Sequence, residues 1–417
     1  MSTILLPFDI ITYIIDTVGE NGDTNLLKEL ALVSRCFHEL CCKYLFATVD
    51  LSVIGSGSPW NPQVPSPKKR FVRLLESRPD VVKYIRQLKY EVGLVREASN
   101  LSLQCQAAAA HRMSDDYLLS PILPNLLRTI TCLNCLTIDA SHIKWNEINP
   151  YLTSAFLHLM HLPTINNINL STIPNFPMSS LTLPANLLRL DLTHLSCVEP
   201  FEDEIAVVQS EMMPKLREFH TSYSPGPTTL LLRAKRQDGQ PAFNITNLRR
   251  LSSCLGDKQN LRYLLQNAKL LERLHLTVGV NQSLEGLLSE SSSARTLKVL
   301  GFSVLILFSS YFPQPLEGVF EELEALAGNN MLEAISFEID VYGNEAEDAI
   351  GSLIQNVKKL VATPGWPALR QVSFEVRICV VAVGAELSEA LQSLFDKYSS
   401  HSSKLESVAF NFSAYVV

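Results

Sequence analysis

The sequence predicts an α/β solenoid of parallel strands with outer helices, preceded by a short three-helix module. Three observations support this prediction. One short strand template recurs eleven times after residue 84, stripes of apolar residues at helical spacing separate its later copies, and a Gly/Ser/Pro-rich segment divides the N-terminus from the repeats. We therefore expect a helical module over residues 1–50, a linker over 51–70 and a solenoid over 71–417.

The first 50 residues predict three short helices. Pro7 suits the first position of a helix, because its fixed φ is helical and its missing N–H would have no partner there. The residues expected at the helix ends are Gly19 and Asn21-Gly22 as stops, Asp23 or Thr24 as the second N-cap, and Ser34 as the third. The apolar faces expected from helical spacing are Ile10, Ile11, Ile14, Ile15 and Val18, then Leu26, Leu27, Leu30, Ala31 and Val33, then Phe37, Leu40, Cys41, Tyr44 and Leu45.

The linear order of this module resembles an F-box, the short helical segment that recruits a substrate receptor to a cullin-type ubiquitin ligase. The resemblance rests on Leu6-Pro7, Leu32-Val33-Ser34-Arg35 and Tyr44-Leu45-Phe46, and it covers residues 5–46 only. Cys36-Phe37 stands where many F-boxes carry a tryptophan. The resemblance implies docking on a Skp-type adaptor, and through it on a cullin scaffold. The docking residues that it suggests are Leu6, Pro7, Ile10, Ile14, Leu30, Val33 and Phe37.

Two alternatives remain open for this module. Any small three-helix cap also carries apolar stripes, so periodicity alone does not separate a docking module from a cap that seals the first strand of a solenoid. Some of the suggested docking residues must also fill the module's own core, Ile14 and Leu30 above all.

The strand template is an apolar residue, two others, an apolar residue, one other, and a residue that is usually apolar. Its copies begin at Ile85, Leu133, Ile165, Leu187, Leu216, Leu248, Leu271, Leu297, Leu332, Leu369 and Leu405. After the first gap the spacing is typical of leucine-rich repeats, and helical stripes between the last copies imply parallel strands. The domain resembles a divergent leucine-rich-repeat solenoid, as in fungal F-box receptors of this type. It lacks the asparagine expected after each strand, so its turns must satisfy their backbone groups in another way.

In such a solenoid the residues that alternate with the template's apolar positions point away from the core. They are Lys89, Arg189, Asp191, Glu218, His220, Arg250, Arg273, His275, Glu338, Gln371 and Glu375. Residues 212–273 hold eleven Lys/Arg against four Asp/Glu, whereas residues 299–357 hold ten Asp/Glu and no Lys/Arg, although solvated helix faces account for much of this charge. We hypothesise that Arg189, Arg250 and Arg273 contact an acidic or phosphorylated substrate segment, with His220 and His275 as further candidates.

Other classes of protein have less support in the sequence. A net charge of −7 disfavours nucleic acid binding, and no phosphate loop, nucleophile elbow or paired metal-ligand motif supports an enzyme, a metal site or another cofactor. The longest apolar runs, Val299–Phe308 and Ile378–Val383, are too short to span a membrane. Nine cysteines without regular spacing suggest reduced thiols in the cytoplasm or nucleus.

The sequence thus predicts a non-enzymatic substrate receptor whose solenoid binds a protein substrate of unknown identity. The alternative is a repeat scaffold for protein–protein interaction that acts without a ligase. A third hypothesis is a solenoid with a pocket for a small ligand. Co-purification with a Skp-type adaptor, with and without Leu6→Asp plus Pro7→Ala, separates the first two.

Overall fold

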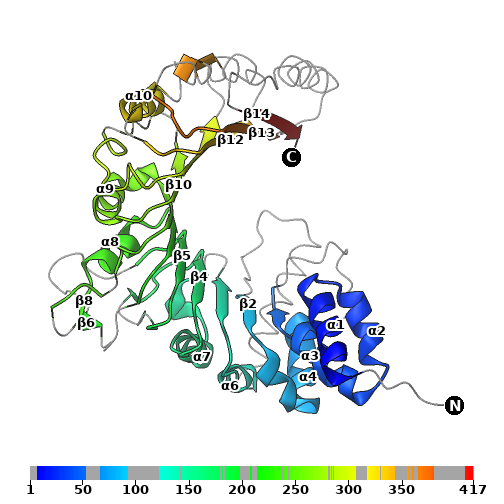
Figure 1. Ribbon diagram of the computed structural model, residues 1–417. Coiled ribbons are helices and arrows are strands. Elements are labelled where there is room, and N and C mark those ends of the chain that lie inside the picture. Colours follow the sequence, from blue (N-terminus) through cyan, green and yellow to red (C-terminus); the bar gives the residue numbers. More distant parts are fainter. Residues whose placement is uncertain are drawn as a thin grey trace. The chain divides into compact units, whose positions relative to one another are not determined.

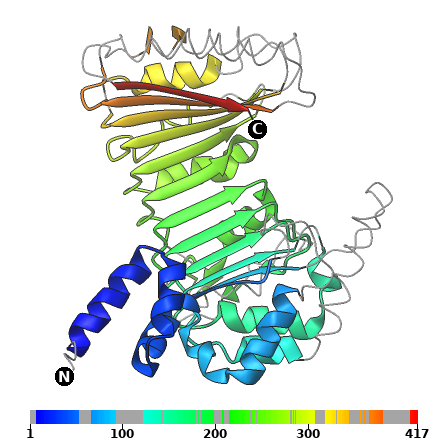
Figure 2. The ribbon, with the colours of Figure 1, turned by 90° about the vertical axis from the view of Figure 1, so that its right-hand side faces the viewer.

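A computed structural model of the chain shows an α/β protein built on parallel strands (Figures 1 and 2). The residues that the structure describes are 7–52, 66–92, 122–140, 143–178, 181, 184–197, 207–208, 214–236, 239–242, 244–279, 282, 284, 286–306, 317–328, 330–342, 355–356, 359–360, 365–379 and 409–416. Residue contacts divide the chain into two compact units. The first unit holds residues 1–214 and 234–242, and the second holds residues 215–233 and 243–417.

The first unit begins with three helices, α1 (Phe8–Glu20), α2 (Thr24–Ala31) and α3 (Arg35–Leu45). The side chains of Asp23 and Ser34 accept the backbone N–H groups of Leu26 and Phe37, so both predicted N-caps are present. Pro7 differs from the prediction, since it occupies the N-cap of α1 with an extended ψ and the helix begins one residue later. Gly19 is required by packing, because a Cβ there would lie 2.4 Å from the ring of Tyr44 on α3.

These helices enclose a core of their own. Ile15, Leu27 and Cys41 are fully buried at its centre, one residue from each helix. The partly buried residues packed around them are Ile11, Val18, Leu30, Ala31, Phe37, Leu40, Tyr44 and Leu45. Leu26 and Val33, predicted on the buried face of the second helix, are instead exposed. Leu26 lies about 100° around α2 from the buried Leu27, and Val33 lies beyond the end of the helix at Ala31.

The first unit continues as a run of parallel strands with helices packed against one side. Its strands, in spatial order, are β1 (Thr48–Asp50), β2 (Gln87–Glu91), β3 (Cys135–Asp139), β4 (Asn167–Ser171) and β5 (Arg189–Thr193). Its remaining helices are α4 (Pro67–Ser77), η1 (Pro79–Tyr84), α6 (Ile122–Arg128), η2 (Trp145–Glu147) and α7 (Pro150–Met160). Two short strands, β6 (Val207–Val208) and β8 (Lys235–Arg236), pair with each other.

The second unit repeats the same arrangement with longer strands. They are β7 (Glu218–Ser222), β9 (Arg250–Cys254), β10 (Arg273–Val278), β11 (Val299–Ile306), β12 (Ala334–Tyr342), β13 (Gln371–Cys379) and β14 (Ala409–Val416). Its helices are α8 (Pro225–Arg233), η4 (Leu255–Asp257), α9 (Lys258–Asn267) and α10 (Glu317–Leu326). The helices α8, α9 and α10 lie on one face of these strands (Figure 1).

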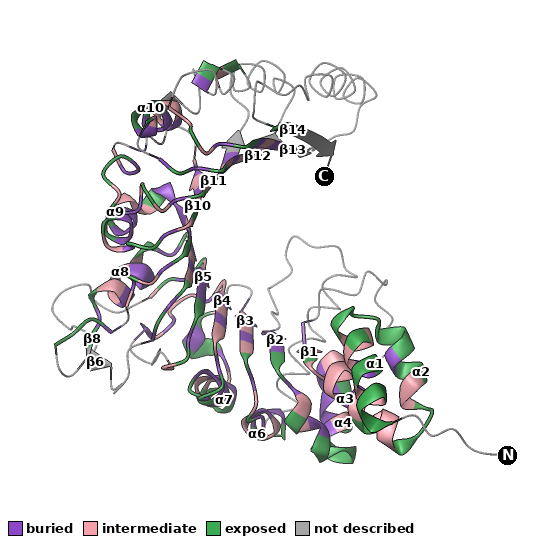
Figure 3. Cartoon of the chain, viewed as in Figure 1, coloured by how far each residue is buried: buried purple, intermediate pink, exposed green. Residues whose placement is uncertain are grey.

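The strand template predicts the strands and their register. The first ten copies fall on or directly before a strand, and where their strands pair, the middle apolar residues align, as in Leu88↔Leu136 and Leu274↔Leu300. The last copy differs from the prediction, because Val372, the middle residue of the tenth copy, pairs with Phe410, the third residue of the eleventh, so this register is shifted by two residues. Burial alternates along the strands, as Figure 3 shows by colour. The strand β1 was missed, because its three residues carry no full template.

The chain lacks the asparagine expected after each strand, and threonine and asparagine side chains before the strands form some of the hydrogen bonds between neighbouring repeats instead. Thr164 and Thr296, each three residues before a strand, donate their Oγ1 hydrogens to the carbonyl oxygens of Leu133 and Leu271 in the preceding repeat, at 2.7 and 2.9 Å. Asn186, at the same offset before β5, donates from its amide to the carbonyl of the preceding turn at 2.9 Å. These side chains give hydrogen-bond partners to carbonyls at the start of the preceding repeat.

Candidate functional site

The three-helix module leaves large apolar side chains in contact with solvent. We call the set of Phe8, Ile10, Tyr13, Ile14, Leu26, Leu32 and Val33 the apolar patch. Its members belong to α1, α2 and the turn that follows α2, and they are between 38% (Leu26) and 87% (Leu32) exposed. Figure 3 shows much of α1 and α2 in the colour of exposed residues. Several large exposed hydrophobic side chains on one small module are typical of an interaction site.

The apolar patch contains part of the predicted docking set. Ile10, Ile14 and Val33 belong to it, and Pro7 is exposed beside it at the N-cap of α1. Leu30 and Phe37 instead pack against the module's own core, and Leu6 lies outside the described residues.

Three members of the apolar patch were not among the predicted docking residues, although they are strongly exposed: Phe8 (61%), Tyr13 (73%) and Leu32 (87%). A signal for an outward apolar surface was present in the paired isoleucines of α1. Ile11 and Ile15 face the core, so their neighbours Ile10 and Ile14, about 100° around the helix, must face elsewhere.

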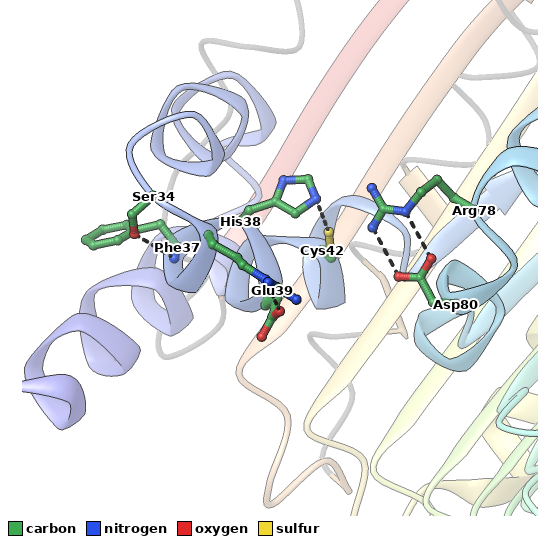
Figure 4. A network of polar contacts seen from close by, with 8 residues as sticks. Ser34, Phe37, His38, Glu39, Cys42, Arg78 and Asp80 are labelled. Carbon is green, nitrogen blue, oxygen red and sulfur yellow. Dashed lines mark hydrogen bonds and ion pairs between the residues drawn. The ribbon is translucent and has the colours of Figure 1, made fainter.

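Polar contacts link the helices of the module, and others form in the neighbouring segment at the start of η1. Lys43 on α3 forms an ion pair of 2.7 Å with Asp16 on α1, and this pairing lowers the pKa of the Asp16 carboxyl. On the other side of α3, His38 and Cys42 contact each other at 3.6 Å, and Arg78 binds both carboxylate oxygens of Asp80 at 2.9 and 3.0 Å (Figure 4).

The thiol of Cys42 is buried, and burial raises its pKa, so it acts as a small packed side chain instead of a nucleophile. Helix α3 contacts η1 at this place, and β1 begins three residues after α3. The carbonyl of Ala47 accepts the N–H groups of Arg86 and Gln87, both at 2.8 Å. The module is therefore joined to the first strands by a short, hydrogen-bonded connection.

The predicted substrate-binding residues lie at the strand positions that alternate with the apolar positions of the template. Arg189 belongs to the first unit, whereas Arg250, Arg273, His220 and His275 belong to the second. Arg250 and Arg273 are directly opposite each other in register, and so are His275 and Ser252. Asp191 differs from the prediction, since it is only 8% exposed, next to Arg189 at 3.8 Å.

A chain of polar contacts crosses four strands of the second unit. Nε2 of His275 on β10 lies 2.7 Å from Oγ of Ser303 on β11, and Ser303 donates its hydrogen to Glu338 on β12 at 3.1 Å. The hydroxyl must therefore accept from His275, which places the imidazole proton on Nε2. Arg377 on β13 completes the chain, at 3.6 Å from Glu338 and 2.7 Å from Asp340.

Gly301 makes room for this arrangement. A Cβ at Gly301 would lie 2.5 Å from Nδ1 of His275, so the imidazole rests on the bare backbone of β11. The predicted acidic pole is partly neutralised here, because Arg377, from outside the counted segment, pairs with two of its carboxylates.

The position of His275 predicts a loss of stability in mild acid. Burial lowers its pKa from the ordinary value of 6.5; Glu338 opposes this effect and His220 adds to it. The unfolded chain then binds the proton more tightly, so the free energy of unfolding should fall as the pH drops below about 6.5 and be unaffected by this group above it. We expect His275→Gln to show a smaller difference in thermal midpoint between about pH 7.5 and about pH 5.5 than the wild type.

A His158→Gln variant, changed on α7 of the first unit, is the matched control for this measurement. It should keep the acid loss of the wild type. Equal pH dependence in the wild type and the His275→Gln variant would contradict the assignment.

We compared the chain with known proteins. A scan of protein-family models and a search of curated proteins both find no match to this chain. Within the described ranges, no helix has the length and apolar character to cross a membrane, and no group of three or more His, Cys, Asp or Glu side chains is placed to hold a metal ion.

Proposed function

We propose that the chain is a substrate-recognition subunit of a cullin-type ubiquitin ligase, in which the three-helix module docks on a Skp-type adaptor. The strands and helices that follow would bind a protein substrate, and the chain would carry no chemistry of its own. The single observation that carries the proposal is the apolar patch, seven exposed apolar side chains on a module that already has a complete core.

The burial pattern favours docking over capping. A terminal cap of a solenoid turns its apolar face toward the first repeat and presents a polar outer face to water. Here the buried residues Ile15, Leu27 and Cys41 pack on one another, and the outer faces of α1 and α2 carry apolar residues. Exposed side chains such as Tyr13 and Leu32 gain nothing from capping, whereas burial against a partner removes them from water.

The linear order of the module supports the choice of partner. Leu6-Pro7, Val33-Ser34 and Leu45-Phe46 occur in the order of an F-box, with Ser34 as an N-cap and Val33 exposed directly before it. The short connection from α3 to β1 would hold a docked adaptor at a defined place beside the first strands.

The test is adaptor binding by the purified full chain, measured by calorimetry and co-purification with a Skp-type adaptor. Ile14→Asp plus Val33→Asp places two charges in the apolar patch without entering the module's core. Anchors of an interface cost about 2 kcal/mol each when lost, so we expect binding to weaken by at least about 100-fold.

The matched control is Tyr151→Asp plus Tyr263→Asp, which places two charges on α7 and α9 at side chains that are 60% and 43% exposed. It should bind the adaptor as the wild type does. A wild-type chain that does not bind, or a patch variant that binds as tightly as the control, would overturn the proposal and leave a repeat scaffold as the better interpretation.

A further inference from the structure

We infer that the N-terminal edge of strands β7, β9 and β10 binds an acidic, Asp/Glu-rich segment of a partner protein. We call Arg217, Arg249, Arg250 and Arg273 the arginine edge. That the partner is a ubiquitination substrate rests on the proposed function, whereas binding of the acidic segment does not.

Parallel pairing brings these four residues together. The N–H groups of Arg249 and Arg250 donate to the carbonyl of Arg217 at 2.8 and 3.0 Å, and the N–H of Arg273 donates to the carbonyl of Arg249 at 2.9 Å. Arg250 also lies between Glu218 and Arg273 in register. Because parallel strands begin at the same edge of a sheet, four guanidinium groups gather across three neighbouring strands.

The arginine edge has more positive charge than its own carboxylates can match. Arg250 pairs with Glu218 at 3.0 Å, and Arg249 pairs with Glu272 at 3.1 Å. Arg217 and Arg273 are exposed and form no ion pair with any residue in the described part of the chain. Four arginines against two glutamates leave a net charge of +2 at this edge.

The internal ion pairs of Arg249 and Arg250 do not prevent these arginines from binding a carboxylate of a partner. The side chains of Arg249 and Arg250 are 53% and 54% exposed, and ion pairs of exposed side chains contribute little to stability. Arg249 donates one N–H group to Glu272, so donors remain for a second carboxylate. A partner can therefore be bound without first breaking a strong internal interaction.

The layout favours a line of carboxylates over one compact anion. Neighbouring strands lie about 4.8 Å apart, so the four guanidiniums are spread along the edge instead of converging on one point. An extended segment presents side chains on one side every ~6.7 Å, a comparable spacing. Glu218 and Glu272, interleaved with the arginines, already show carboxylates accommodated at this edge.

The opposite end of the same face offers no comparable excess. Lys298 at the start of β11 lies 3.9 Å from Glu333, and Arg377 on β13 is shared between Asp340 and Glu338. Arg370, directly before β13, is a single exposed arginine without an ion pair to a described residue, whereas Arg217 and Arg273 bring two such arginines to the β7–β10 edge.

The experiment measures binding of a fluorescent peptide of alternating glutamate and glycine to the full chain by anisotropy, at low and high salt. We expect binding that weakens with salt, and no binding of the matching glutamine–glycine peptide. Arg217→Gln plus Arg273→Gln should weaken binding at least ~10-fold. Lys258→Gln plus Arg262→Gln, which removes the same charge from α9 on the other face of the strands, should leave it unchanged.

Each other result overturns the inference. Absence of binding, or equal losses in the two double variants, would reduce the arginine edge to general surface charge. Binding only to a glycine peptide with one phosphoserine would assign the edge to phosphate. Adaptor binding measured on the same variants separates the two proposals, because it should be normal in Arg217→Gln plus Arg273→Gln, and peptide binding should be normal in Ile14→Asp plus Val33→Asp.

Discussion

Replacing Phe337 by alanine is expected to lower the free energy of unfolding of the second unit by about 4 kcal/mol, the usual cost of a large aromatic side chain lost from a core. Phe302, Phe337 and Phe374 occupy the same position of the template on β11, β12 and β13. Their rings are stacked, with centroids 5.4 and 5.0 Å apart, and each is no more than 1% exposed. Phe337 is the middle ring and also stacks on Phe320 of α10 at 6.3 Å, so its loss removes three ring contacts, each worth about 1 kcal/mol beyond burial.

The measurement is urea unfolding followed by circular dichroism, combined with amide hydrogen exchange. In a repeat structure each strand depends on its neighbours, so exchange should accelerate first in β11, β12 and β13. Tyr263→Ala, an aromatic truncation at an exposed site on α9 of the same unit, should change stability by less than about 1 kcal/mol. Similar losses in the two variants would mean that the phenylalanine stack does not hold these strands together.

The strands were predictable because the physical signal is periodic. Each template places apolar side chains at alternate positions, and a shift of one residue would turn all of them to solvent, so the pattern determines both the element and its register. Leu251, Leu274 and Leu300 illustrate this, since they align across three neighbouring strands. The helix caps Asp23 and Ser34 were predictable for a similar reason, because their hydrogen bonds are local in sequence.

The candidate surfaces were predictable only in part, because exposure and pairing depend on contacts between distant residues. Helical spacing could not tell which of Ile10 and Ile11 faces the core, since both lie near one apolar stripe. The arginines on alternate strand positions were found, but their partners were not. Arg217 and Arg249 were missed because they precede the alternating positions and are brought to the same edge by strand pairing.

Glu322 is a second case in which distant contacts decide the role of a residue. It belongs to α10, where a charged residue is ordinarily expected on the solvated face of the helix. It is instead only 7% exposed. Its carboxylate accepts the backbone N–H groups of Gly286, of Leu288 at 3.1 Å and of Ser289 at 3.2 Å. One side chain thus satisfies three donors of the turn that precedes β11.

Glu322→Ala is expected to lower the free energy of unfolding of the second unit by about 2 kcal/mol, because the buried N–H of Leu288 would lose its partner at a cost of about 1–3 kcal/mol and the half-buried bonds of Gly286 and Ser289 would be lost with it. Glu322→Gln should cost less, since the amide keeps one acceptor oxygen but turns its NH₂ toward other donors. Glu324→Gln, an exposed position on the same helix, is the matched control and should be nearly neutral. The readouts are urea unfolding and the exchange rates of the amides of Leu288 and Ser289. If those amides exchange no faster in Glu322→Ala than in Glu324→Gln, the carboxylate does not organise this turn, and α10 is held to the repeat by its apolar face alone.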